Sequence, residues 1–230
     1  MKYLAGNSNY DKFPCVDIKG FANQAWQDWA AIVAQVKQRV SGNQKHVLVV
    51  DTYHGVDHNE LLDQLIMPLK PSHIVFTDEA KYGEEHIFEM LERNITNDRV
   101  FGVVAPHKLH EFFDAEKLAE TRHQIENATD GLIVVYGHGA RLFADGDTFI
   151  YADLARWEIQ QRFRRGELGN WGVENTDEDV LRRYKRAFFI EWRVFDRYKT
   201  KLLPQADFLL DTNAAFMPKM VTGEAFMAGV

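Results

Sequence analysis

Short and almost wholly apolar segments recur along this chain, and segments with helical periodicity separate most of them. Such apolar segments are typical of strands that are buried on both faces of a sheet. The expected strands cover residues 46–52, 73–77, 99–105, 132–136, 148–152 and 207–211. The expected helices cover residues 22–40, 58–67, 79–93, 115–127, 156–165 and 178–203. The alternation predicts an α/β fold of three layers, with a mostly parallel sheet between helices.

The length of 230 residues is that of one α/β domain. Within it we expect an N-terminal extension and helix over 1–44 and core strand–helix units over 45–155. Arginine-rich, lid-like helices are expected over 156–203, and a final strand and tail over 204–230. Residues 1–20 lack periodicity and are expected to be irregular. The small apolar residues after Asn213 indicate an interface strand or a junction to another part of a protein.

Several classes of protein are disfavoured by simple features of the chain. Its apolar runs are far shorter than the roughly 20 residues needed to cross a bilayer. Residues 1–7 lack the apolar core of a signal peptide. Cys15 is the single cysteine, so an internal disulfide is excluded. These features predict a cytoplasmic protein without a membrane partner. The net charge of −7 disfavours a nucleic-acid partner.

Positive charge is nevertheless concentrated in one stretch. Residues 155–201 hold twelve Lys and Arg against eight Asp and Glu. A local basic region on an acidic protein suits a small anionic ligand better than a polyanion. The alternative is a pair of solvated helices that carry i,i+4 salt bridges.

The turn Gly137-His138-Gly139 precedes this basic stretch and follows an expected strand. Glycines permit close approach of the backbone to a ligand, and arginine suits two-pronged contacts with phosphate. We therefore predict a site for a phosphorylated ligand at the turn and at five arginines of the two helices: Arg156, Arg162, Arg164, Arg193 and Arg197. A simple chain reversal is the alternative interpretation of the turn.

The first expected core strand ends in a loop that departs from the usual phosphate loop. The motif Gly-x-x-x-x-Gly-Lys-Ser/Thr occurs nowhere, and this loop holds one glycine and no lysine. Backbone N–H groups at the start of the next helix could still receive an anion, so Tyr53, His54 and Gly55 are predicted ligand contacts. Strong hydrolysis or transfer of phosphate from ATP is not expected.

Two carboxylates follow expected strands and are the predicted catalytic residues. Asp51 and Asp78 would contact a ligand hydroxyl group or a Mg²⁺ ion that accompanies a nucleotide. The alternative is that Asp51 and Asp57 cap the helix after the first of these strands, and that Asp78 caps the helix after the second.

The nine histidines include His54 and His58, whose i,i+4 spacing is that of zinc ligands on a helix. Because no carboxylate is placed beside them by the sequence, no metal site formed by the protein is predicted.

Five segments resemble the N-terminal region of some bacterial class I mannose-6-phosphate isomerase-like proteins. They are residues 50–56, 97–102, 151–162, 189–197 and 209–213. More remotely, the order of an apolar strand, an acidic strand end, a glycine turn and an arginine-bearing helix is similar to uridine-kinase-like proteins of the phosphate-loop fold. The resemblance implies a kinase-like domain of carbohydrate metabolism. It also implies a cupin isomerase domain as partner, because the chain lacks the His, Glu and Gln cluster that isomerises in such proteins.

These observations predict a phosphate-loop-kinase-like domain with a degenerate loop that binds a phosphorylated sugar or a nucleotide, with weak phosphotransfer or none. Two alternatives stay open. One is an active sugar or nucleoside kinase with an unconventional loop. The other is a non-catalytic module that docks on a cupin isomerase. Mannose-6-phosphate isomerisation would require a cupin domain that this chain does not contain.

Overall fold

The computed structural model describes residues 15, 17–42 and 44–230. Most of the predicted irregular segment 1–20 and the predicted lack of a signal peptide at 1–7 lie outside these residues. Among the described helices, none is long and apolar enough to cross a membrane.

Within the described residues, one seven-stranded sheet forms the centre of the molecule, in the order β1-β7-β6-β5-β2-β4-β3. The strands are β1 (Ala25–Gln27), β2 (His46–Thr52), β3 (His73–Phe76), β4 (Leu132–Gly137), β5 (Thr148–Asp153), β6 (Phe208–Asp211) and β7 (Lys219–Thr222). The five neighbouring strands β6, β5, β2, β4 and β3 run parallel, whereas β7 pairs antiparallel with both β6 and β1. The predicted α/β class with a mostly parallel sheet is therefore confirmed.

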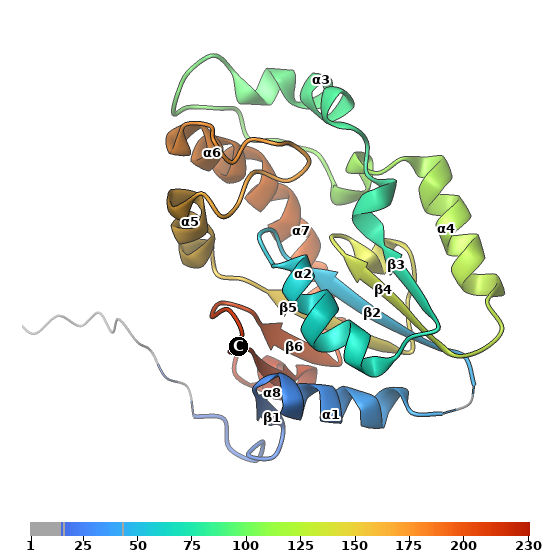
Figure 1. Cartoon of the computed structure of the whole chain (residues 1–230). Coiled ribbons are helices and arrows are strands. Elements are labelled where there is room, and N and C mark those ends of the chain that lie inside the picture. Colours follow the sequence, from blue (N-terminus) through green and yellow to red (C-terminus); the bar gives the residue numbers. More distant parts are fainter. Residues whose placement is uncertain (1–14, 16, 43) are drawn as a thin grey trace, which may run out of the picture.

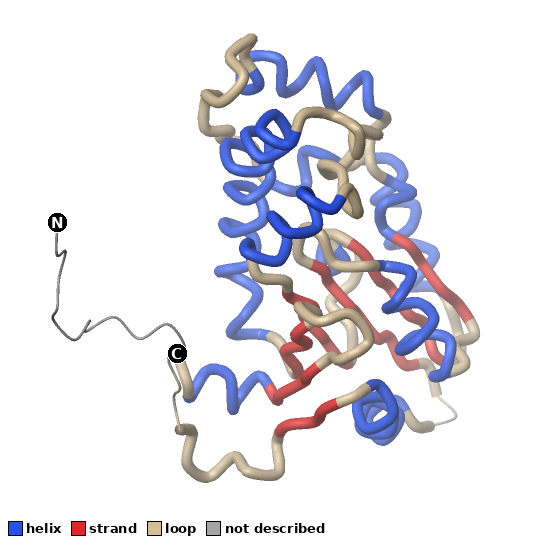
Figure 2. Tube along the Cα trace, turned by 60° about the vertical axis from the view of Figure 1, so that its left-hand side comes forward, coloured by secondary structure: helices blue, strands red, loops and turns tan. Residues whose placement is uncertain are grey.

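The principal helices are α1 (Trp29–Val40), α2 (His58–Leu61), α3 (Glu84–Ile95), α4 (Ala115–Asn127), α5 (Arg156–Arg165), α6 (Val180–Arg186), α7 (Trp192–Leu202) and α8 (Gly223–Ala228). A π-helical turn, Leu62–Ile66, continues α2, and a second one, Ala187–Glu191, joins α6 to α7. Helix α2 lies in front of the sheet in Figure 1, while α3, α5 and α6 gather beyond the carboxyl ends of the parallel strands. Figure 2 shows the same helical layer extending past one end of the sheet.

One predicted strand is wrong. Residues 99–105 form no strand, and Val100, Phe101, Val103 and Val104 are largely exposed. The segment is apolar but runs beside α3 and the π-helical turn, because Val103 N donates to Asn94 O and Ala105 N donates to Phe189 O. These bonds take the place of the ladder to a neighbouring strand.

At one edge of the sheet, β1 was not predicted, and β7 was predicted only as an interface strand or a junction after Asn213. Residues 25–27 belong to β1 and not to the predicted helix over 22–40, which begins at Trp29 after the N-cap Asp28. β7 comes from the tail and places Lys219 opposite Gln27 in β1 and opposite Asp211 in β6. The tail is thus part of the same sheet, and the interface strand expected there pairs within the chain. Helix α3 likewise begins later than predicted, because Thr77–Ala80 forms a separate 3₁₀ turn.

β2 is the central strand of the parallel part of the sheet, and later strands lie on both sides of it. β3 and β4 lie on one side of β2, and β5 and β6 lie on the other. In open α/β sheets, ligands bind beyond the carboxyl ends of the strands at such a switch point. The topology therefore directs attention to the ends of β2, β3 and β4.

The carboxylate of Asp51 connects the end of β2 to the turn after β4 and to α7. Asp51 is fully buried at the end of β2, and it accepts hydrogen bonds from Gly139 N at 3.1 Å, Arg141 N at 2.9 Å and Tyr198 Oη at 2.7 Å. Burial raises the pKa of Asp51 from 3.8 to about 6, although these three hydrogen bonds act in the opposite direction. The same contact and burial raise the pKa of Tyr198 well above its ordinary value.

We expect Asp51 to make stability depend on pH between about 4 and 6. Because its pKa in the folded protein lies above 3.8, the folded state binds more protons than the unfolded state in this window. Its contribution to the free energy of unfolding is therefore full below pH 4 and falls as pH rises, by an amount on the order of 3 kcal/mol. Urea unfolding of the wild type and Asp51→Asn from pH 4 to 7 measures this contribution. The wild-type value should fall relative to that of the variant, and a difference that does not change with pH would contradict the assignment.

Candidate functional site

A cavity of about 530 Å³ lies beyond the carboxyl ends of β2, β3 and β4. We call it the histidine cavity, and its lining consists of residues 54–56, His58, Asp78, residues 81–84, His138, residues 168–174 and Thr176. The lining comes from the segments that follow three parallel strands and from the loop between α5 and α6. Its volume is in the range of small-molecule sites, which is roughly 300 to 1,000 Å³.

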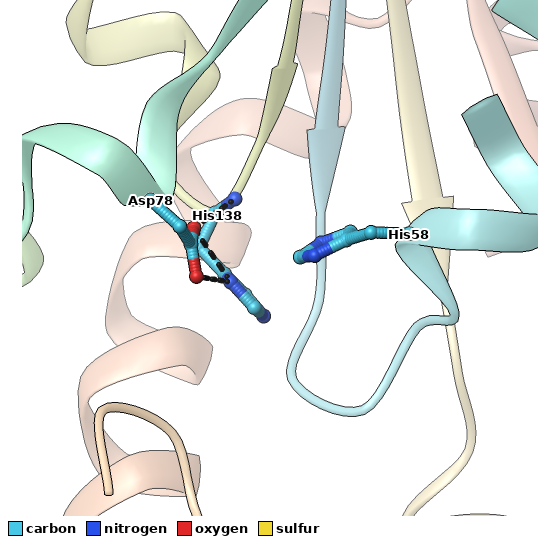
Figure 3. A group of neighbouring side chains, drawn as sticks. All are labelled: His58, Asp78 and His138. Carbon is cyan, nitrogen blue, oxygen red and sulfur yellow. Dashed lines mark hydrogen bonds and ion pairs between the residues drawn. The ribbon is translucent and has the colours of Figure 1, made fainter.

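Asp78 and His138 form a hydrogen-bonded pair in the wall of the cavity. His138 Nδ1 lies 3.0 Å from both carboxylate oxygens of Asp78, and the backbone N–H of His138 donates to Asp78 Oδ1 at 3.2 Å (Figure 3). The other ring nitrogen, Nε2 of His138, is buried and has no hydrogen-bond partner among the described residues. A buried polar atom without a partner is unfavourable, so it indicates a place for a ligand, an ion or a water molecule.

Burial acts to raise the pKa of Asp78. The adjacent His138 and His58 and the N–H of Trp171 together outweigh burial and hold this pKa below its ordinary range. Asp78 is therefore ionised at neutral pH. A carboxylate beside Nδ1 of an imidazole fixes the orientation of the ring.

His58 brings a second imidazole to the same wall. Its ring centre lies 4.6 Å from that of His138, and its Nε2 lies 2.9 Å from Thr52 Oγ1. Figure 3 shows the His58 ring directed from the start of α2 toward the other two side chains. His58, Asp78 and His138 can each offer one ligand atom to a metal ion, and these three atoms lie within 4.8 Å of one another. Burial, and then the proximity of His138, lowers the pKa of His58 to about 3, so this imidazole is neutral at physiological pH.

Trp171 closes the cavity on the side of the loop between α5 and α6. Its Nε1 donates to Asp78 Oδ2 at 2.9 Å, and its ring packs against His138, Phe112 and Phe195 at centroid distances of 5.3, 5.1 and 5.2 Å. The ring thus shields the Asp78–His138 pair from solvent and holds the carboxylate in place.

Glu191 holds this wall from behind. It is buried in the π-helical turn, and it accepts hydrogen bonds from Trp171 N at 3.0 Å and Asn170 Nδ2 at 2.8 Å. Arg186 Nε donates to it at 3.1 Å, and His54 Nε2 lies 3.3 Å away. Burial lowers the pKa of His54, although the charge of Glu191 opposes this effect. His54 is therefore a neutral group in contact with a carboxylate that is already paired with Arg186.

Of the two predicted catalytic carboxylates, the structure places Asp78 in the cavity wall and Asp51 outside it. Asp51 has no exposed surface, and its oxygens are engaged by the three donors described above. Nor does Asp51 cap the next helix, because Asp57 accepts from Asn59 N and Glu60 N there. The predicted contact of Asp51 with a ligand hydroxyl or Mg²⁺ is therefore corrected to a structural role.

The predicted contacts in the loop after β2 divide in the same way. His54 and Gly55 line the cavity, whereas Tyr53 is buried and donates its hydroxyl to Asp196 Oδ1 at 2.8 Å. The backbone of Gly55 has a φ of +88°, and a Cβ at this position would meet Leu168 and Leu154 at 2.9 and 3.0 Å. Gly55 O accepts from Arg162 Nη1 at 3.0 Å. The loop thus packs against apolar side chains, and its Tyr53 and Val56 N–H groups donate to Ala152 O and Tyr53 O within the protein.

At the predicted glycine turn, only His138 lines the cavity. Gly137 and Gly139 have φ values of +120° and +69°, and a Cβ on Gly137 would approach Thr77 Oγ1 to 2.4 Å. These glycines are required by the tight chain path that carries His138, so the chain-reversal interpretation holds for them.

The structure does not bring the five predicted phosphate-binding arginines to the cavity. Arg156 pairs with Asp196, Arg162 donates to Gly55 O and Thr212 O, Arg164 lies over the Trp157 ring, Arg193 donates to Phe188 O, and Arg197 donates to Ala105 O and His107 O. Lys81 is the one Lys or Arg side chain in the described lining. Because carbonyl and carboxylate oxygens satisfy most of these guanidinium groups, the convergence predicted for them does not occur.

His58, Trp171 and Glu191 are the functional residues that the sequence did not assign. His58 was weighed with His54, its neighbour at i,i+4, but its partners come from the ends of β3 and β4. Glu191 carried a usable signal, because it is a single carboxylate inside the otherwise apolar stretch of residues 187–192. Trp171 lies in a glycine-rich loop and carried none.

Comparisons with known proteins give a family and a weak similarity to a solved structure. The model of a family described as a domain of unknown function, DUF8485, matches residues 28–230. No curated protein matches the chain. Among solved structures, a phosphoribulokinase from Rhodobacter spheroides is 14% identical, with a TM-score of 0.40 over 73% of this chain and 70% of that chain. The resemblance to mannose-6-phosphate isomerase-like proteins stays a prediction.

We expect Glu191→Gln to destabilise the protein and loosen the Trp171 wall. The substitution leaves Arg186 without its buried partner charge, which typically costs about 3 kcal/mol or more. For a domain of this size, the Tm should fall by roughly 6 to 12 °C, and Trp171 should become more accessible to acrylamide quenching.

The matched control is Glu167→Gln, which removes an exposed partner of Arg165. Exposed pairs contribute little, so its Tm should equal that of the wild type. Equal Tm values for both variants would show that Glu191 does not hold this wall.

Proposed function

We propose that this chain, which belongs to the DUF8485 family, binds a small uncharged, hydroxyl-rich molecule in the histidine cavity and activates one of its hydroxyl groups at His138. The observation that carries the proposal is the Asp78–His138 pair in the wall of a ligand-sized cavity at the switch point of the sheet. A hydroxyl group that meets an oriented imidazole is the starting point of transfer and isomerisation reactions.

The charges of the lining favour an uncharged ligand over a phosphorylated one. Asp78, Glu84 and Glu174 contribute carboxylates, whereas Lys81 contributes the single permanent positive charge among the described lining residues. A phosphate group would therefore meet more negative than positive charge. The hydroxyl group of Thr176 and the ring of Trp171 offer the mixture of hydrogen-bonding groups and flat apolar surface that suits a sugar.

His138 supplies the chemistry of the proposal. Its Nδ1 lies against Asp78, and its buried Nε2 has no partner among the described residues. An imidazole oriented by a carboxylate acts as a general base, which activates a hydroxyl group. Trp171 covers the pair and limits the access of water.

Transfer of phosphate from ATP is not part of the proposal. The loop after β2 has no lysine, its Tyr53 and Val56 N–H groups donate to backbone carbonyls, and Asp57 occupies the start of α2. The predicted phosphorylated ligand remains a competing hypothesis because Lys81 lies in the lining. Docking of a cupin isomerase domain also stays a prediction.

A comparison of sugars with their phosphates tests the ligand class. The sugars to be tested are mannose, glucose and ribose. A sugar that binds should raise the Tm by roughly 3 °C when it is present at about ten times its Kd. The corresponding phosphates should give smaller shifts. A larger shift with a phosphate, lost in Arg193→Ala, would overturn the proposal in favour of the arginine site.

The substitution Gly83→Trp tests whether the shift comes from the histidine cavity. Gly83 lines the cavity, and an added Cβ would meet no atom within 4 Å, so the backbone accepts a side chain at this position, and an indole there should reduce the space for a ligand. Gly42→Trp is the matched control, because Gly42 lies outside the cavity and its Cβ would approach an atom only at 4.0 Å. The sugar-induced shift should vanish in Gly83→Trp and persist in Gly42→Trp. Persistence in both would place the ligand elsewhere.

A further inference from the structure

We propose that His58, Asp78 and His138 together bind one divalent transition-metal ion, of the class of Zn²⁺, Co²⁺ or Fe²⁺. This inference rests on the proposed function and deepens it, because the ion would be the group through which the histidine cavity activates a hydroxyl. The sequence analysis predicted no metal site in the protein, since the nearest pair of histidines along the chain, His54 and His58, had no carboxylate beside it.

The convergence of three segments is the geometric basis. His58 comes from the start of α2, Asp78 from the turn after β3 and His138 from the turn after β4. One ligand atom from each lies within 4.8 Å of the others, and the distance from His138 Nδ1 to either oxygen of Asp78 is 3.0 Å. Ligand bonds of roughly 2.0 to 2.2 Å place neighbouring ligand atoms about 3 to 3.5 Å apart, so a small contraction around His58 completes the site.

The burial of His138 is the second observation. Its side chain is only 7% exposed, and its Nε2 has no hydrogen-bond partner among the described residues. With Nδ1 bound to the ion beside Asp78, Nε2 would carry the proton and face the cavity as a hydrogen-bond donor. Thr52 Oγ1 lies 2.9 Å from Nε2 of His58 and fixes that ring.

The donor set selects the class of ion. Two imidazoles and one carboxylate suit Zn²⁺, Co²⁺ and Fe²⁺, whereas Mg²⁺ and Ca²⁺ prefer oxygen ligands alone. The predicted Mg²⁺ with a nucleotide therefore does not fit these three residues. Three protein ligands also leave coordination positions for a substrate oxygen or water, as in catalytic zinc sites. The surrounding Glu84 and Glu174 add negative charge, which favours a cation.

Metal binding by the whole chain tests the inference. After treatment with EDTA and its removal, the protein is dialysed against Zn²⁺ or Co²⁺, and the bound metal is measured by mass spectrometry. We expect one equivalent in the wild type, with a visible absorption band for bound Co²⁺. His58→Ala and His138→Ala should each weaken binding by at least tenfold. The control His123→Ala, on the exposed face of α4, should bind like the wild type.

His138 is buried, so His58→Ala decides the result if the His138 variant fails to fold. Substoichiometric metal in the wild type, or unchanged Co²⁺ affinity and spectrum in His58→Ala, would overturn the metal site. The sugar-induced thermal shift, measured in EDTA, distinguishes this failure from that of the proposed function. A shift that persists without bound metal would support the cavity as a ligand site in which His138 acts as a base. Metal binding without any sugar-induced shift would support the metal site and overturn the proposed sugar ligand.

Discussion

The buried carboxylate of Asp51 is the interaction on which the position of the site depends. It joins the end of the central strand β2 to the turn after β4 and to Tyr198 of α7. Because His138 lies within that turn, the same hydrogen bonds fix His138 relative to the strand ends. Burial of the carboxylate opposes its ionisation, and the three donors compensate only in part. The position of His138 is therefore held by a polar interaction inside an apolar sheet, where an unsatisfied group would be costly.

Two further carboxylates extend this arrangement from the sheet to the cap of helices. Asp78 engages His138 and Trp171, and Glu191 engages Arg186 and the backbone of Trp171. Trp171 thus lies between two carboxylates: its indole donates to the partly buried Asp78 on the sheet side, and its backbone N–H donates to the buried Glu191 on the helical side. Such networks specify one geometry because each member is satisfied only when the others are in place. The cavity owes its shape to these contacts as much as to apolar packing.

The sequence predicted the core well and the site only in part, for physical reasons. The strands β2, β4 and β5 were evident because a strand buried on both faces must be apolar throughout. The segment 99–105 has the same composition, but its backbone hydrogen bonds go to Asn94 and Phe189 and not to a strand. The arginines were predicted to bind phosphate for a related reason. A guanidinium group that binds phosphate and one that binds backbone carbonyl oxygens, as Arg162 and Arg197 do, are identical in a sequence.

Local pattern determined the α/β class, the parallel core, the absence of a phosphate-loop motif and the candidacy of Asp78 and His138, because each depends on residues close together in the chain. Tertiary structure decided which groups meet. It separated His54 from His58, joined His58 to two residues from other strand ends, and moved the arginines away from the cavity. Pairing of residues 25–27 with 219–221 was likewise beyond local reasoning. Contacts between distant segments follow from the register and order of the strands, which composition and periodicity do not encode.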